Sequence, residues 1–440
     1  MSTFIKSPEL LSPAGSLKRM RRAFAYGADA VYAGQPRYSL RARNNEFTHE
    51  KLVLGIEEAH VQNKLFFIAS NIIAQNNKIK TYLRDLEPVI EAKPDALIMT
   101  DPGLIMMVKE RWPHQIVHLS VQSSVMNYAS VKFWKSVGIE RVILSRELSL
   151  ADIQTIRDEC PDIELEVFVH GALCMAYSGR CLLSGYFNHR DANQGACTNA
   201  CRWQYSLKEA KEDDWGNAHI EANQAYVFEQ SPQRAGEMNV VEEDEHGTYL
   251  FNSKDLRAIQ HVEALIKMGI DCVKIEGRTK SDFYVARTTQ LYRRAIDDVV
   301  AGNPFDWKLM DALEGLSLRG YTEGFYRRHV PEEYQSYKDR NTTGLRQQVV
   351  GECISYDTQR QRLTMHVKNR FSLGDTLEIM LPSGNQLFTL EGLEDQQGQS
   401  ISHAPGSGHT VNVQIPLDDI SQLEHGYIIR HWEEMHESPV

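Results

Sequence analysis

Short apolar runs alternate with amphipathic stretches along residues 9–278 of the chain. Each run is almost continuously apolar, which is typical of strands buried on both faces of a parallel sheet. The runs lie at 9–15, 29–34, 65–71, 95–101, 116–122, 141–147, 163–171 and 271–278. Between them, helical stretches such as 16–27 and 128–138 end on a glycine that suits a helix C-cap. Eight strands alternating with helices predict an α/β fold, a (β/α)8 TIM-like barrel; the alternative is an open doubly wound sheet.

The pattern changes beyond residue 347, where short runs of alternating apolar and polar residues are separated by turn signals. These runs lie at 348–356, 362–369, 375–384, 386–393, 409–416 and 426–432. Such spacing predicts a small all-β domain, which we expect to be a β-barrel. We therefore divide the chain into a barrel at 1–335, a connector at 336–346 and a C-terminal β-barrel domain at 347–440.

Negative charge is concentrated in one segment of the barrel region. The whole chain of 440 residues has a net charge of -11, and residues 205–247 hold 11 acidic against 3 basic side chains. The first 50 residues instead carry 8 Lys and Arg against 4 acidic residues. We interpret 205–247 as an acidic, solvated insert, so the net charge does not exclude a nucleic-acid partner.

The composition indicates a cytoplasmic protein without a membrane segment. No apolar run approaches the length of about 18 residues that a membrane helix needs, and the N-terminus lacks the apolar centre of a signal peptide. The chain has 7 cysteines, and an odd number in such a chain favours ligands or buried thiols over a disulfide framework. Cys160, Cys272 and Cys353 lie in apolar surroundings and are expected to be buried thiols, although Cys272 could substitute as a ligand.

The other cysteines form a loop at 171–203, directly after the seventh predicted strand. Their spacing is Cys174-x6-Cys181-x15-Cys197-x3-Cys201. Loops at this end of barrel strands build active sites, and four thiolates can bind zinc or an iron–sulfur cluster. Structural zinc usually takes closely spaced cysteine pairs, so the wider spacing favours a cluster. Zinc and unrelated buried thiols are the alternatives.

The last predicted barrel strand carries Lys274, Glu276 and Arg278 at every second position, so all three point to one side. The interior of a barrel is usually apolar, and three charges there need one another or a polar ligand. We predict that they are catalytic residues around an anion pocket, in which Arg278 binds a carboxylate. A structural Lys–Glu–Arg network is the alternative.

Further candidates stand at other predicted strand ends. Gln122 and Arg146 are expected to bind substrate, and His170 precedes the cysteine loop. A histidine there suits proton transfer near neutral pH, although a hydrogen-bonded core histidine is an equal alternative.

The loop after the second predicted strand is rich in arginine. Arg41 and Arg43 follow Arg37 and Tyr38 in the stretch "QPRYSLRARNN". Arginines interleaved with an aromatic residue suit phosphate binding and base stacking, so we expect Arg41 and Arg43 to bind substrate. The alternative is a solvated loop.

The segment "EVFVHGALCMAYSGRCLLS" at 166–184 resembles the signature of the collagenase-like peptidase family of unknown catalytic type. The residues in register are Glu166, Phe168, Gly171, Ala172, Leu173, Cys174, Gly179, Cys181, Leu183 and Ser184. Blocks such as "YGADAVYAG", "KIEGRTKSDFYVA" and "VKNRFSLGDTLEIM" extend the resemblance over nearly the whole chain. "GQPRYSLRARNNEF" and "DANQGACTNACRW" are most similar to the bacterial tRNA uridine-5-hydroxylation branch of that family.

This resemblance implies an enzyme whose chemistry differs from the family name. Several branches are oxygen-independent hydroxylases, and those acting on RNA depend on prephenate. The resemblance implies that the tRNA anticodon loop is the partner and that the wobble uridine becomes 5-hydroxyuridine. It also implies a 4Fe–4S cluster on four cysteines, which here are Cys174, Cys181, Cys197 and Cys201.

Three alternatives stay open. Ribosomal RNA hydroxylation would use the same chemistry on a larger substrate. A collagenase-like peptidase would follow the family name, although the chain has no GxSxG motif and four cysteines exceed what a Cys–His nucleophile needs. The third alternative is a non-catalytic RNA-binding protein that is held together by zinc.

Overall fold

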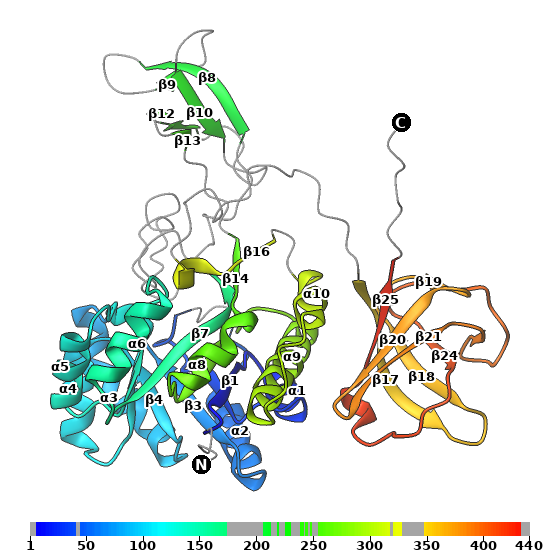
Figure 1. The fold of residues 1–440 in the computed structure, drawn as a ribbon, viewed down its shortest axis with the longest axis horizontal. Helices are drawn as coiled ribbons and strands as arrows, with labels where there is room; N and C mark the ends of the chain where they lie inside the picture. Colours follow the sequence, from blue (N-terminus) through cyan, green and yellow to red (C-terminus); the bar gives the residue numbers. More distant parts are fainter. Residues whose placement is uncertain are drawn as a thin grey trace.

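The first domain is a closed parallel barrel (Figure 1). The computed structural model describes residues 6–40, 45–173, 254–316, 320–327 and 347–432, together with short strands between 206 and 248 without their side chains. The barrel strands are β1 (Glu9–Pro13), β2 (Ala30–Gly34), β3 (Leu65–Ser70), β4 (Ala96–Met99), β5 (Val117–Leu119), β6 (Arg141–Ile143), β7 (Glu164–Ala172) and β15 (Cys272–Ile275). Because β15 pairs in parallel with both β1 and β7, the sheet closes on itself. The predicted TIM-like barrel is confirmed, and the open sheet is excluded.

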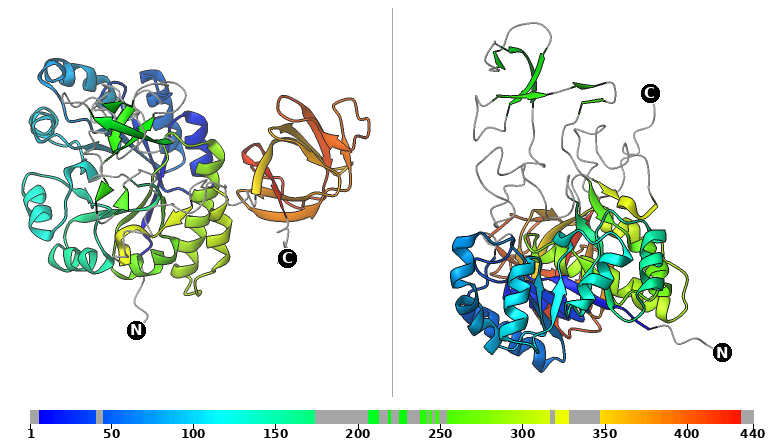
Figure 2. Two further views of the ribbon diagram at one scale, coloured as in Figure 1. Left: turned by 90° about the horizontal axis from the view of Figure 1, so that it is seen from above. Right: turned by 90° about the vertical axis from the view of Figure 1, so that its left-hand side faces the viewer.

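Helices surround this barrel, as the view along its axis shows (Figure 2). They are α1 (Leu17–Ala25), α2 (His49–Val61), α3 (Asn76–Glu91), α4 (Pro102–Arg111), α5 (Tyr128–Ser136), α6 (Leu150–Glu159), α8 (Val262–Lys267), α9 (Asp282–Val300) and α10 (Lys308–Glu314). Short 3-10 turns are η2 (Val121–Ser123), η6 (Ile259–His261), η7 (Gly324–Arg327) and η9 (Leu423–His425). Within the described ranges, no helix is both long enough and apolar enough to cross a bilayer.

Local sequence signals set the helix ends. Ser16 and Ser149 each accept a hydrogen bond from a backbone N–H of the first turn, and Ser149 forms a capping box with Asp152. The glycines predicted to end α1 and α5, Gly27 and Gly138, have φ angles of 99° and 88°. Residues with a Cβ rarely adopt this left-handed backbone, so the predicted C-cap positions are confirmed.

The barrel core forms where apolar strands meet the inner faces of the helices. Leu11, Phe66 and Val142 are fully buried on β1, β3 and β6, and Tyr292 is fully buried on α9. Removing one such large apolar side chain from water contributes about 1.5–3 kcal/mol. This burial holds the strand ends in fixed positions and so fixes the geometry of the barrel mouth.

Two short strands extend the sheet beside β7. Strand β14 (Asp255–Arg257) pairs antiparallel with the end of β7, and β16 (Tyr321–Thr322) pairs in parallel with β14. With three and two residues, they are too short to show a hydrophobic period, and the sequence did not predict them.

The acidic insert predicted at 205–247 contains strands that its composition did not indicate. These are β8 (Ser206–Glu212), β9 (Ala218–His219), β10 (Ala225–Glu229), β11 (Met238–Val241), β12 (Glu243–Asp244) and β13 (Gly247–Thr248). They form an antiparallel sheet in the order β11-β10-β8-β9 and a separate β12–β13 pair.

The C-terminal domain is antiparallel and all-β, as predicted. Its strands are β17 (Gln347–Asp357), β18 (Arg362–Val367), β19 (Phe371–Ser372), β20 (Thr376–Leu381), β21 (Gly384–Thr389), β22 (Leu393–Glu394), β23 (His403–Ala404), β24 (Thr410–Gln414) and β25 (Tyr427–His431). Each of the six predicted runs overlaps one of the longer strands. Seven strands form one sheet, which curls around a separate apolar core (Figure 2).

The C-terminal domain packs against α1 and α9 of the barrel. Tyr26, Ala286, Met380, Tyr427 and Ile429 form a shared apolar cluster. The buried Tyr26 hydroxyl donates to the Met380 carbonyl oxygen at 3.0 Å. The two domains therefore share a well-packed interface.

Candidate active site at the barrel mouth

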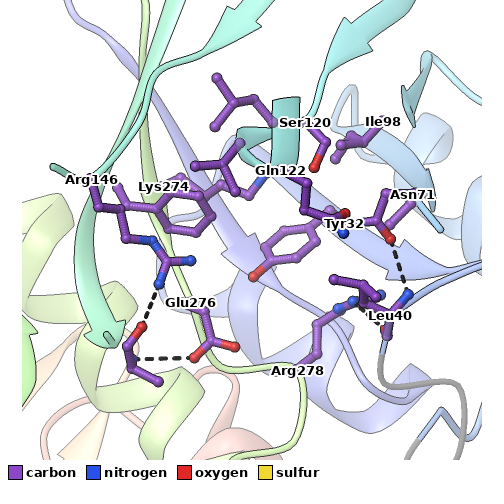
Figure 3. Close-up of a pocket in the computed structure, with 15 residues that line it drawn as sticks. Tyr32, Leu40, Asn71, Ile98, Ser120, Gln122, Arg146, Lys274, Glu276 and Arg278 are labelled. Atoms are coloured by element: carbon purple, nitrogen blue, oxygen red, sulfur yellow. Dashed lines mark hydrogen bonds between the residues drawn. The ribbon is translucent and has the colours of Figure 1, made fainter. Parts of the chain in front are cut away.

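A small cavity opens where the barrel strands end (Figure 3). Its volume is about 110 Å³. Five residues that the sequence predicted as catalytic or substrate-binding line it together: Gln122, Arg146, Lys274, Glu276 and Arg278. They come from η2 after β5, from the loop after β6, and from β15 and the loop that follows it. The carboxyl ends of parallel barrel strands converge at one face, which explains why residues so distant in sequence meet here.

Lys274 forms a buried ion pair beneath this cavity. Its Nζ donates to Oε1 of Glu166 on β7 at 2.7 Å, and the two side chains are 3% and 0% exposed. Burial lowers the pKa of Lys274, and the Glu166 carboxylate opposes that effect. Sequence reasoning did not identify Glu166 as the partner, although a glutamate within the apolar run of β7 was the available signal.

The pair belongs to a larger network, here called the Glu166 cluster, which consists of Glu9, Arg141, Glu164, Glu166 and Lys274. Arg141 donates to Glu9 at 2.7 Å, to Glu164 at 2.8 Å and to Glu166 at 3.4 Å. Three carboxylates and two cations give a formal charge of -1 when all are ionised. The Glu166 cluster thus anchors Lys274 from inside the barrel and already supplies the negative charge that this lysine needs.

Arg146 and Glu276 meet at the end of β7. Nη1 of Arg146 donates to the carbonyl oxygen of Ala172 (Figure 3). The backbone N–H of Ala172 in turn donates to Oε2 of Glu276 at 3.3 Å. The Arg146 guanidinium lies 4.0 Å from the ring centroid of Phe168. Its Nε is buried and has no hydrogen-bond partner among the residues that the structure describes. A half-buried guanidinium with spare donor capacity suits an anionic or polar ligand.

Arg278 approaches the cavity from the other side. Its Nη2 donates to the Leu40 carbonyl oxygen at 2.6 Å, and the Leu40 N–H donates to Oδ1 of Asn71 at 3.1 Å. Figure 3 shows the guanidinium groups of Arg146 and Arg278 on either side of Glu276. Lys274 thus takes part in a structural network, whereas the two arginines present their charge to the cavity.

The turn at the end of β7 depends on Gly171. Its φ is 108°, and a Cβ at this position would lie 2.5 Å from the Glu276 carbonyl oxygen. The pairing of β7 with β15 also shifts register between Lys274 and Ile275, which is a β-bulge. A bulge redirects the side chains that follow it, and His170 lies at this point.

His170 lies outside the cavity, in a buried group of tyrosines. Its Nδ1 is 3.3 Å from the Tyr292 hydroxyl, and its Nε2 is 3.4 Å from the Tyr321 hydroxyl. Burial, with the positive charges of Lys280 and Arg257, lowers the pKa of His170 to about 3. The imidazole is neutral at pH 7, which favours the hydrogen-bonded core histidine over the proton-transfer residue.

Six predicted site residues lie outside the described residues: Arg41, Arg43, Cys174, Cys181, Cys197 and Cys201. Their roles stay predictions. The predicted loop 171–203 nevertheless begins within the end of β7, where Ala172 contacts Arg146 and Glu276. Cys160, Cys272 and Cys353 are buried thiols, as expected.

Comparison with known proteins identifies the family. Residues 15–336 match the model of peptidase family U32, and residues 345–430 match the model of the C-terminal domain of that family. The solved structure of the U32 peptidase Mk0906 is similar at 12% identity and a TM-score of 0.38, covering 63% of this chain and 97% of that one.

Relatives match over greater lengths. The tRNA hydroxylation protein P of Escherichia coli is 56% identical over 97% of each chain, and that of Haemophilus influenzae is 55% identical over 95% of each. A 23S rRNA 5-hydroxycytidine synthase of Escherichia coli is 32% identical over 66% of this chain and 40% of its own. On the family models and this near full-length identity, the chain belongs to peptidase family U32.

Proposed function

We propose that this protein is a tRNA hydroxylase that converts the wobble uridine of the anticodon loop to 5-hydroxyuridine without molecular oxygen. The observation that carries the proposal is the 56% identity, over 97% of both chains, to a protein named for tRNA hydroxylation. A more distant relative named for 5-hydroxycytidine in ribosomal RNA supports the same reaction class. This identity extends over the whole barrel and the C-terminal domain. We therefore assign the reaction to the residues that line the cavity at the barrel mouth.

The cavity offers groups that suit a pyrimidine base. Tyr32 and Phe168 line it with aromatic rings, each with a cationic group over the ring, and Gln122 supplies an amide that can donate to and accept from the base edge. Enzymes that act on a base take it out of its stack, and bases in a loop are the least costly to extrude. A splayed uracil is therefore the ligand that we assign to the aromatic side of the cavity.

The charged side of the cavity suits a carboxylate co-substrate, for which we propose prephenate. Arg146 and Arg278 present guanidinium forks, which bind carboxylates in a bidentate manner. Glu276 lies between the arginines as a proton acceptor, and Lys274, whose charge is balanced within the Glu166 cluster, lines the same cavity. Arg41 and Arg43 are proposed to bind the RNA.

The cysteine loop is proposed to hold a 4Fe–4S cluster. Four thiols are the donor set that such clusters use, and Cys174, Cys181, Cys197 and Cys201 would supply it. When bound, a cluster of this kind supplies electron transfer or a Lewis-acidic iron. The neighbouring protein groups, Arg146 and Glu276, would orient the substrate at the edge of this loop.

Mass spectrometry of tRNA nucleosides tests the proposal. A host that lacks the gene is given the intact chain, the Cys197→Ala variant, or the Cys160→Ala variant as a control outside the loop. We expect 5-hydroxyuridine to return with the intact chain and with Cys160→Ala, and to stay absent with Cys197→Ala. If the intact chain does not restore the nucleoside, the proposed function is wrong.

The same strains and purified proteins distinguish the three alternative functions. A hydroxylated nucleoside in ribosomal RNA alone would favour the ribosomal substrate. Peptide cleavage that survives Cys174→Ala together with Cys181→Ala would favour a peptidase. Zinc without acid-labile sulfide in the purified protein would favour the zinc-bound, non-catalytic protein.

A further inference from the structure

A group of cations lies on the rim of the barrel, outside the cavity. Arg37 stands in the loop after β2, and Lys78, Lys80 and Arg84 stand on the first turns of α3; together they are called the α3 basic patch. The side chains of Arg37 and Arg84 are 64% and 72% exposed, and Lys80 is exposed as well. Such a concentration of positive charge stands out in a chain with a net charge of -11.

The α3 basic patch is held in a fixed geometry. Asp85 accepts from Arg37 at 2.8 Å and from Nη2 of Arg84 at 3.0 Å, and its Oδ2 also accepts from the Tyr38 hydroxyl at 2.8 Å. Tyr38 is fully buried and packs edge-on against Tyr82 at 5.1 Å between ring centroids. One carboxylate therefore orients two exposed guanidinium groups and leaves an excess of positive charge.

The patch is tied to the cavity by the loop after β2. Leu40, which lines the cavity, is three residues beyond Arg37, a span of at most about 11 Å of extended chain. The Ile72 N–H donates to the Tyr38 carbonyl oxygen at 3.2 Å, and this bond fixes the loop to the end of β3. The patch and the cavity therefore share one short loop, which keeps them close together.

We propose that the α3 basic patch binds the phosphodiester backbone of the RNA next to the nucleotide in the cavity. This inference rests on the proposed function for the choice of RNA. Phosphate contacts position a nucleic acid without reading its sequence, and fixed guanidinium forks suit phosphate oxygens. The patch would hold the strand in register while the cavity selects the base.

Binding of an unmodified tRNA transcript to the full-length protein, followed from 50 to 200 mM KCl, tests this proposal. The test variant is Arg37→Asn/Lys80→Gln/Arg84→Gln, in which asparagine tolerates the left-handed φ of 68° at position 37. The control is Lys132→Gln/Lys135→Gln/Lys267→Gln, which removes the same charge from α5 and α8. A second control, Arg37→Lys/Lys80→Arg/Arg84→Lys, keeps the charge of the patch.

We expect the test variant to bind tRNA about ten- to a hundredfold more weakly at 100 mM KCl, with a salt slope smaller by about two to three. The α5 and α8 control should bind like the intact chain. The charge-keeping control should bind more weakly than the intact chain but more tightly than the test variant, because lysine keeps the charge and lacks the guanidinium fork. All proteins should melt at the same temperature. An unchanged affinity of the test variant, or an equal loss in the α5 and α8 control, would overturn the proposal. So would a test variant that loses binding to poly-glutamate but not to tRNA, because the patch would then serve an acidic protein partner.

The result of this binding test can be distinguished from the result of the test of the proposed function. Binding is measured without turnover, whereas the proposed function depends on 5-hydroxyuridine returning with the intact chain. An intact chain that restores the nucleoside, with a test variant that binds normally, would reject the patch alone. Weakened binding of the test variant, with no nucleoside restored by the intact chain, would reject the proposed reaction alone.

Discussion

Two buried charge networks among the described residues differ in how their charges are balanced. The first is the Glu166 cluster beneath the cavity. The second, here called the Glu378 cluster, joins the domains. In it, Glu378 of β20 accepts from Arg287 of α9 at 2.8 Å, from Asn385 at 2.7 Å and from His431 at 2.8 Å. Arg287 and Glu378 are both almost fully buried.

The difference lies in how the charges are balanced. In the Glu378 cluster, one carboxylate takes all these donors; burial would raise the pKa of Glu378, but His431 and Arg287 outweigh it and lower that pKa. In the Glu166 cluster, by contrast, burial lowers the pKa of Lys274 despite its partner Glu166. A carboxylate that accepts several hydrogen bonds from both domains suits a structural role, which is to hold the domains together. Lys274 is a buried, paired cation whose pKa is lowered beside a cavity, so the Glu166 cluster is less evenly balanced than the Glu378 cluster.

Breaking the Glu378 cluster should give the largest loss of stability. Glu378→Ala leaves Arg287 buried without its carboxylate, which costs about 3–5 kcal/mol. Denaturant unfolding of the full-length protein measures this loss. Glu424→Ala, at a position with a 69% exposed side chain, is the control and should change stability by less than about 0.5 kcal/mol. Equal effects of the two changes would mean that the Glu378 cluster does not fasten the domains.

Removing a cavity arginine should affect activity instead of stability. Arg278→Met takes away a positive charge from the proposed carboxylate site, so we expect the rate of 5-hydroxyuridine formation to fall about 100- to 1000-fold. The unfolding free energy should stay close to that of the intact chain. Arg111→Met, on the exposed face of α4, should leave the rate unchanged. A full rate with Arg278→Met would rule out an anion site at this position.

His170 tests how burial, together with the nearby positive charges of Lys280 and Arg257, changes pH dependence. Its folded pKa of about 3 lies below the unfolded value of 6.5, so stability is complete above pH 6.5 and is lost as pH falls toward 3. Between pH 7.5 and 5, this histidine removes about 2 kcal/mol from the unfolding free energy. The free energy of unfolding of His170→Gln should therefore depend less on pH in this range. The same pH dependence in both proteins would show that folding does not lower the pKa of His170.

Removing the partner of Lys274 should have the smallest effect on the rate at neutral pH. Because the Glu166 carboxylate raises the pKa of Lys274, Glu166→Gln should lower that pKa further. If the reaction needs protonated Lys274, the alkaline limb of the pH–rate profile moves to lower pH while the rate at neutral pH changes little. Glu164→Gln removes a carboxylate that contacts Arg141 and should not move the limb. If the alkaline limb stays in place with Glu166→Gln, it reports the pKa of another group.

The sequence by itself determined the order of elements. The eight apolar runs became β1 to β7 and β15, and the six alternating runs became the long strands of the second domain. Hydrophobic periodicity is a local property of the chain, and strand and helix formation follow it directly. The spacing of charges at Lys274, Glu276 and Arg278 also predicted that these side chains share one cavity.

Only the tertiary structure decided which charges meet. Lys274 and Glu166 are 108 positions apart, and Arg287 and Glu378 are 91 apart. Such pairs depend on strand register and domain packing, which no local pattern records. The bulge between β7 and β15 likewise decided that His170 faces the tyrosines instead of the cavity. The physical reason is that one shift in pairing redirects a side chain while leaving the hydrophobic pattern unchanged.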